Sequence, residues 1–146
     1  MASHESEFRA LLDIRVDACE KKDIDRLMSL FDPDIIYYDV VPPLEFAGYD
    51  KVRSNFQRWF DEYDGPIALE THGLEISVSE DVAFAHMLHL DSGVHKNGIE
   101  AAVWLRSTVC ARWSGDKWLI AHEHISLPVN GTWWVEGQDK GHRTAD

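Results

Sequence analysis

The second half of the chain is a series of long strand-forming segments, and this feature constrains the fold more than any other. The segments are rich in β-branched and aromatic residues and span residues 67–79, 82–92, 100–113 and 118–127. They are separated by turn-forming residues, namely Glu80-Asp81, Asn97-Gly98 and Ser114-Gly115-Asp116. Strands joined by such short turns are antiparallel neighbours, so the sequence predicts an antiparallel meander.

Three amphipathic helical segments precede these strands. Apolar residues recur at helical spacing in residues 5–21, in a short segment that begins after Asp23, and in residues 49–63. A further strand, in DPDIIYYDVVPP, ends at Pro42 and Pro43. Helices followed by a meander predict an α+β fold, in which a cone-shaped, curved antiparallel sheet packs on three N-terminal helices around an internal pocket.

Length and composition narrow the classes of function. The 146 residues suit one domain, which we place at residues 1–136, with a polar tail at 137–146. The net charge of −12 and the lack of a basic cluster argue against nucleic acid and anionic membranes as partners. No apolar run approaches the about 20 residues of a membrane span, no signal peptide is evident, and Cys19 and Cys110 lack metal or redox spacing. We expect a cytoplasmic protein.

The turns also predict which strand residues face the helices. A two-residue turn at Asn97-Gly98 places His86 opposite Val109, and one at Gly115-Asp116 places His122 opposite Val109. The predicted pocket face therefore carries Phe84, His86, Leu88, Leu105, Ser107, Val109, Ala111, Trp118, Ile120, His122 and His124.

The other face has no helix left to cover it. It is predicted to carry Met87, His89, Trp104, Arg106, Thr108, Cys110, Leu119, Ala121, Glu123 and Ile125. A large apolar sheet face usually marks an interface, so the sequence predicts a homodimer through this face. Trp133 and Trp134 are expected either to cover a dimer edge or to close the pocket mouth.

Two segments carry a resemblance to a known family. They are DIIYYD, which ends at Asp39 with Gly48 nine residues on, and RSTVCARWSGDKWLIAHEHISLP at residues 106–128. With the order of elements over residues 5–130, they resemble the SnoaL-like and ketosteroid-isomerase-like branch of the nuclear transport factor two fold. The closing strand is also similar to the association domain of calcium/calmodulin-dependent kinase II. This fold hosts isomerases, cyclases, dehydratases, epoxide hydrolases and binding modules.

The resemblance implies that Asp39 points into the cone as a carboxylate base. The helix position at which the isomerases carry an oxyanion-binding tyrosine is Arg15 in this sequence, and their second, protonated aspartate has no counterpart. In an apolar pocket Asp39 can take a proton from a carbon beside a carbonyl; alternatively it is a solvated or amide-capping carboxylate at a strand end. Arg15 either meets Asp39 or an anionic ligand, or keeps its guanidinium in water.

His122 and His124 are the other predicted catalytic residues. They can act as donors or proton shuttles around Asp39, as a metal-binding pair with His86, or as hydrogen-bonded structural histidines. We expect neither a metal nor a cofactor. Tyr37 shares the strand parity of Asp39, and its hydroxyl either orients a substrate oxygen or bonds to backbone.

The remaining predicted ligand contacts form the walls of the pocket. Trp59, Phe60 and Trp118 are core residues that can also present an apolar wall, and Val109 lies beside them. His72 is similar in placement to a catalytic histidine of the dehydratases of this fold. Together the residues predict an enzyme that performs proton transfer on a small hydrophobic carbonyl compound as an isomerase, cyclase or dehydratase. The alternative is a non-catalytic ligand-binding or assembly module.

Overall fold

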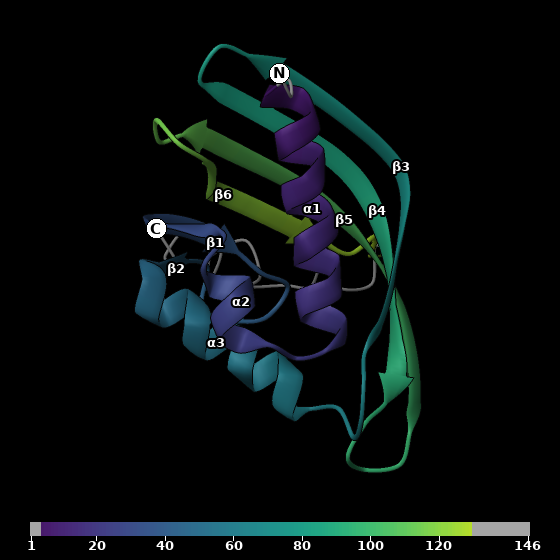
Figure 1. Cartoon of the computed structure of the whole chain (residues 1–146). Helices are drawn as coiled ribbons and strands as arrows, with labels where there is room; N and C mark the ends of the chain where they lie inside the picture. The colour runs from purple at the N-terminus through teal and green to yellow at the C-terminus, as the bar shows by residue number, and fades with distance from the viewer. Residues whose placement is uncertain (1–3, 130–146) are drawn as a thin grey trace, which may run out of the picture.

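The computed structural model of the protein describes residues 4–129 and confirms the predicted α+β architecture. Helices and strands follow in the order α1 (His4–Glu20), α2 (Ile24–Met28), β1 (Phe31–Tyr38), β2 (Phe46–Ala47), α3 (Tyr49–Asp61), β3 (Ala68–Ser79), β4 (Val82–Val94), β5 (Glu100–Trp113) and β6 (Trp118–Ser126). The helices lie against one face of a curved, open sheet (Figure 1). Trp133 and Trp134 and the predicted tail lie outside the described residues.

The sheet contains six strands in the order β2-β1-β6-β5-β4-β3. Its pairs are antiparallel, except that β1 runs parallel to β6. The long strands β3, β4 and β5 bend across the molecule and leave a concave face, along which α1 lies (Figure 1). None of the described helices is both long and apolar enough to cross a membrane.

Each helix buries the stripe that its sequence periodicity predicts. In α1 the buried positions are Phe8, Leu11, Leu12, Arg15, Ala18 and Cys19. Asp23 caps α2, because its side chain accepts a hydrogen bond of 3.2 Å from the backbone N–H of Arg26.

Arg15 is a charged residue inside the otherwise apolar buried stripe of α1. The expectation that its guanidinium lies in water is wrong, since Arg15 is only 4% exposed.

The loop between β4 and β5 has three residues, where the sequence suggested two. His95 pairs with Ile99, because its N–H donates to the Ile99 carbonyl at 2.9 Å, and Gly98 adopts a positive φ of 84°. A glycine in this left-handed conformation is typical of three-residue hairpin loops. The longer loop shifts the register by one residue, so Val109 pairs with Ala85 and not with His86. A one-residue shift exchanges the two faces of β4.

The hairpin from β5 to β6 begins as predicted, with Trp113 opposite Trp118. The register then changes between Cys110 and Ala111, where Ala121 is an extra residue in β6. This bulge reverses the faces of the rest of the strand, so that Val109 lies opposite Glu123. His122 and His124 consequently point to the outer face, and Glu123 points to the helices.

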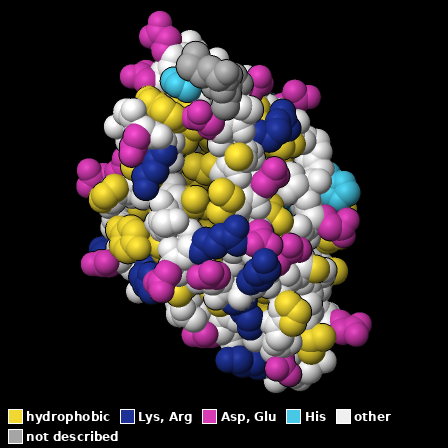
Figure 2. Space-filling view, in the orientation of Figure 1, with side chains coloured by type: hydrophobic (Ala, Val, Ile, Leu, Met, Phe, Trp, Pro, Cys, Tyr) yellow, Lys and Arg dark blue, Asp and Glu magenta, His cyan; other side chains and the backbone are white. Residues whose placement is uncertain are grey.

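The surface around these elements is acidic, as the net charge of −12 predicts. Figure 2 shows Asp and Glu side chains spread over the face that carries the helices, with Lys and Arg side chains among them. The excess of acidic over basic residues is unfavourable for binding a phosphate backbone.

Candidate functional site

A cavity of about 260 Å³ lies between the helices and the concave face of the sheet. Its walls come from α1, the end of β1, α3, and the inner faces of β3 to β6. Of the predicted site residues, the cavity is lined by Arg15, Tyr37, Asp39 and Trp59. The lining is mostly apolar with a few polar groups, which is the usual composition of a small-molecule site.

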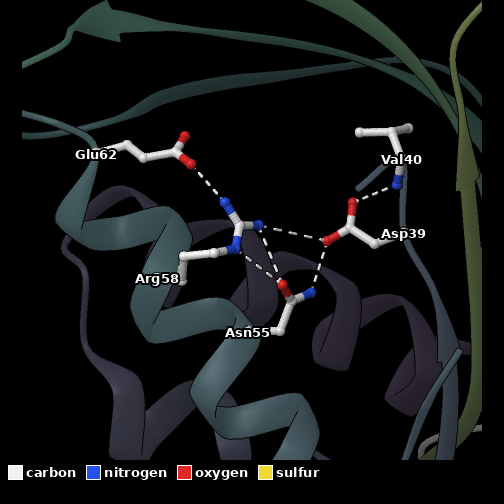
Figure 3. A network of polar contacts seen from close by, with 5 residues as sticks. All are labelled: Asp39, Val40, Asn55, Arg58 and Glu62. Carbon is white, nitrogen blue, oxygen red and sulfur yellow. Dashed lines mark hydrogen bonds and ion pairs between the residues drawn. The ribbon is translucent and has the colours of Figure 1, made fainter. Parts of the chain in front are cut away.

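Asp39 is held at the pocket wall by a polar network (Figure 3). Its Oδ1 accepts a hydrogen bond from the backbone N–H of Val40, and its Oδ2 accepts one from Asn55 Nδ2, both at 2.6 Å. Arg58 Nη2 lies 3.8 Å from Oδ2, and Arg58 Nε also donates to the Asn55 side-chain oxygen at 3.1 Å. Arg58 in turn pairs with Glu62. The carboxylate therefore has a fixed position and orientation.

Deeper in the molecule, Arg15 forms an ion pair with Glu123, and the two side chains are 5% and 0% exposed. Ser107 Oγ also donates to Glu123 Oε2 at 3.3 Å. Burial raises the pKa of Glu123, while Arg15 acts in the opposite direction. Burial by itself would lower the pKa of Arg15, but the negative charge of Glu123 reverses this effect and the pKa rises. Arg15 therefore stays charged.

His89 is a neutral histidine in the wall of the same cavity. A guanidinium can only donate, so Arg15 Nη1, at 3.4 Å, donates to His89 Nε2, which must be unprotonated. The proton then sits on Nδ1 and is donated to Thr71 Oγ1 at 3.3 Å. Burial, together with the positive charge of Arg15, lowers the pKa of His89 to about 3. The expectation that His89 lies on the opposite face is wrong, because of the shifted β4 register.

Asp91, two residues along β4, also lines the cavity and is 6% exposed. Among residues 4–129 no group donates to its buried Oδ1, and no cation forms an ion pair with it. Burial raises the pKa of Asp91 to about 6, helped by the negative charges of Glu123 and Asp39 and opposed by Arg15. A buried carboxylate without a partner is rare in folded proteins.

Four aromatic rings form a connected arc around the cavity. Tyr37 contacts Phe56 at 5.2 Å between ring centroids, Phe56 contacts Trp59 at 6.4 Å, and Trp59 contacts Tyr63 at 6.1 Å. Tyr63 fits because Gly93 has no side chain: a Cβ there would lie 2.8 Å from the tyrosine ring. Burial, then the nearby charges of Glu123 and Asp39, raises the pKa of Tyr37 well above its usual value, so its phenol keeps its proton.

Three predicted ligand contacts are core residues and do not line the cavity. Phe60, Val109 and Trp118 are buried in the main cluster, and the Trp118 indole donates to the His4 carbonyl at 2.7 Å. His72 is exposed on β3, with its ring near Trp104 and its Nε2 3.5 Å from Glu70. The structure therefore does not bring these four predicted residues to the lining of this cavity.

The histidines His86, His122 and His124 lie on the outer face, so their predicted position in the pocket is also wrong. The Nδ1 atom of His122 hydrogen-bonds to the Ile36 carbonyl at 2.7 Å, and the rings of His122 and His124 contact Tyr38. His122 and Tyr38 line a second hollow of about 720 Å³ on this outer face. In residues 4–129 no group of three His, Cys, Asp or Glu side chains is arranged to hold a metal.

Comparison with known proteins gives the family. The family model described as a SnoaL-like domain matches residues 9–130. The chain therefore belongs to the SnoaL-like family. No functionally curated protein matches the sequence.

Solved structures agree with this fold. A nuclear transport factor 2-like protein of unknown function from Pseudomonas putida KT2440 is 27% identical, with a TM-score of 0.78 over 86% of this chain and 87% of that chain. A ketosteroid isomerase-like protein from Erwinia carotovora atroseptica is 17% identical, with a TM-score of 0.75 over 89% of this chain and 100% of that chain. A nuclear transport factor 2-like superfamily protein from Salmonella enterica is 18% identical, with a TM-score of 0.76 over 87% of this chain and 92% of that chain.

Proposed function

We propose that this SnoaL-like protein is a small-molecule enzyme that moves a proton on an apolar carbonyl compound, with Asp39 as the base. The observation that carries this proposal is the fixed carboxylate of Asp39 on the wall of an apolar, aromatic cavity. Proton abstraction from carbon needs a base that is held in one orientation beside the substrate. The hydrogen bonds from Val40 and Asn55 supply that orientation.

The chemical step follows from the groups in the cavity. Asp39 takes a proton from a carbon next to the carbonyl, and the electrons of the broken C–H bond form a C=C bond and leave negative charge on the oxygen. Tyr37 is a donor for this oxygen, because its phenol keeps its proton and lies in the same wall. His122 and His124 have no role in this step, because they lie on the other side of the sheet.

Deuterium exchange tests the assignment without knowledge of the natural substrate. β-Tetralone, an apolar ketone with acidic C–H bonds, is incubated with the protein in deuterium oxide, and deuterium incorporation next to the carbonyl is followed by NMR. The wild type should accelerate exchange, and Asp39→Asn should reduce this acceleration at least about a hundredfold, as expected for loss of a general base.

The control is Asp34→Asn, because Asp34 lies on β1, which ends one residue before Asp39, and lines the outer hollow. Its exchange rate should equal that of the wild type. Exchange by Asp39→Asn within threefold of the wild-type rate would refute Asp39 as the base. Binding of the ketone without any exchange would favour a ligand-binding module of the same fold.

We also propose a homodimer through the outer sheet face and a cytoplasmic location. The outer face exposes large apolar side chains, including Val82, Phe84, Leu88 and Trp104, which are 46–51% exposed. The corrected register replaces Met87, Glu123 and Ile125 of the predicted interface with Phe84, Leu88 and His122. The cytoplasmic location is supported by the free thiols of Cys19 and Cys110.

A further inference from the structure

We propose that the ligand of the internal cavity carries a protonated amine, which binds at Asp91 within the aromatic arc of Tyr37, Phe56, Trp59 and Tyr63. The inference rests on the proposed function only in taking this cavity as the small-molecule site. It narrows the proposed substrate class to carbonyl compounds that also bear an ammonium group.

The first support is that Arg15, the buried cation that acts on Asp91 among residues 4–129, directs both of its terminal nitrogens to other residues. Arg15 directs Nη2 to Glu123 and Nη1 to His89, and neither atom bonds to Asp91 in the described part of the chain. His89 cannot supply a positive charge, because its Nε2 accepts from Arg15 and it is neutral. Within residues 4–129, the buried Oδ1 of Asp91 thus lacks the partner that a buried carboxylate oxygen normally has.

The second support is the charge balance of the site. Asp39, Glu62 and Asp91 line the cavity, and Glu123 lies directly behind Arg15. Among residues 4–129, the arginines that line the cavity are Arg15 and Arg58, and both already pair with carboxylates. In the described part of the chain four carboxylates face two guanidiniums, so the site attracts a cationic ligand and repels a carboxylate ligand.

The third support is the chemistry of the walls. The rings of Tyr37, Phe56, Trp59 and Tyr63 surround the cavity and stand at steep angles to their neighbours. Tyr63 lies near Asp91, whose negative charge, after burial, raises the pKa of the Tyr63 phenol. Aromatic faces beside a carboxylate stabilise a desolvated ammonium through both its charge and its C–H groups.

The proposal is tested with three probes: tryptamine, tryptophol and indole-3-acetate. Each has an indole ring with a two-carbon side chain, and they differ in the group at its end. They are cationic, neutral and anionic at pH 7, and their affinities are measured by NMR titration of the full chain. Tryptamine should bind at least about tenfold more tightly than tryptophol, and indole-3-acetate should bind more weakly than both. Asp91→Asn should remove the preference for tryptamine and leave tryptophol within threefold.

Asp64→Asn, which changes an exposed carboxylate outside the cavity lining, is the matched control and should keep the preference. A second measurement needs no variant, because the amine stays charged between pH 5 and 8. Burial, with Arg15, Glu123 and Asp39 acting on the carboxyl, gives Asp91 a pKa of about 6, and the neighbouring His89 stays neutral in this range because its pKa is about 3. Tryptamine affinity should therefore fall below pH 6, and tryptophol affinity should not.

The outcomes separate this inference from the proposed function. Equal or tighter binding of tryptophol or indole-3-acetate would overturn the ammonium site and leave the cavity as a small-molecule site. Absence of binding by all three probes, with deuterium exchange of β-tetralone intact, would likewise overturn the inference alone. Absence of both binding and exchange would overturn the two proposals together.

Discussion

Asp91 is a residue whose environment makes folding depend on pH. Its carboxyl has an ordinary pKa of 3.8 and a pKa of about 6 in the folded protein. Because the folded value is the higher one, the stabilising contribution of Asp91 is complete below about pH 4 and is lost as the pH rises through about 6. His89 acts in the opposite sense: its depressed pKa of about 3 stabilises the fold above about pH 6.5, and this contribution is lost as the pH falls toward 3.

We predict that Asp91→Asn has a higher free energy of unfolding than wild type, and that this gain is larger at pH 7 than at pH 4. The difference between the two pH values should be on the order of 2 to 3 kcal/mol, because the variant has no charge to bury. Urea unfolding of both proteins at the two pH values measures it. His89 is present in both proteins, so its contribution largely cancels in the comparison.

Asp64→Asn is the control for this pH comparison, since its carboxylate is exposed and should give no such difference. If the free energies of unfolding of Asp91→Asn and wild type differ by the same amount at pH 4 and pH 7, the raised pKa of Asp91 is contradicted. The pH dependence of tryptamine affinity would then no longer test the ammonium site, whereas the comparison of cationic, neutral and anionic probes still would.

At the scale of elements, the sequence predicted the helices and strands well and their faces poorly. Periodicity identified the helices, and turn residues bounded the strands, because both depend on neighbours in the chain. The faces of β4 and β6 depend on single-residue events: a three-residue loop ending in Gly98 and a bulge at Ala121. Each event exchanges the two sides of a strand.

The local pattern in β6 favoured the wrong face. Ile120, His122 and His124 alternate without interruption, so nothing local signals the bulge. The competing requirement is distant: Glu123 must face α1 to pair with Arg15, 108 positions away in the chain. For β4 a signal did exist, because a three-residue loop that ends in glycine is the next most common hairpin connection after a two-residue turn. A predicted three-residue loop would have placed His89 and Asp91 in the pocket.

We predict that Gly98→Ala destabilises the protein by about 1 to 2 kcal/mol. A Cβ at this position meets no atom within 4 Å, so the cost comes from the positive φ of 84° alone. Chemical denaturation measures the loss, and Lys96→Ala in the same loop should change stability by less than about 0.5 kcal/mol. An unchanged midpoint for Gly98→Ala would show that the hairpin does not need this conformation.

At the scale of the whole molecule, the proposed homodimer has its interface on the outer sheet face. Phe84 and Trp104 are 48% and 49% exposed in the single chain, and no described helix covers that side of the sheet. We predict that the wild type is a dimer in sedimentation velocity and that Phe84→Glu is a folded monomer. Burying a carboxylate against an apolar partner face costs more than the lost ring contacts.

Leu44→Glu is the control for this substitution, since Leu44 is 61% exposed but lies in the segment before β2. It should remain a dimer. A monomeric wild type, or a dimer that tolerates Phe84→Glu, would exclude this face as the interface. Deuterium exchange by a monomeric Phe84→Glu variant would further show that the internal cavity works within a single chain.

The position of β6 between β1 and β5 has a consequence for synthesis of the chain. A hydrogen bond such as that between His122 and the Ile36 carbonyl joins residues 86 positions apart. On the ribosome, α1, β1 and α3 therefore emerge long before the strand that completes the sheet beside β1. Until residues 118–126 arrive, Arg15 lacks Glu123 and the edge of β1 that receives β6 stays open. The cavity can be completed only after residues 118–126 have been made, and an open strand edge during that interval is a known site of association.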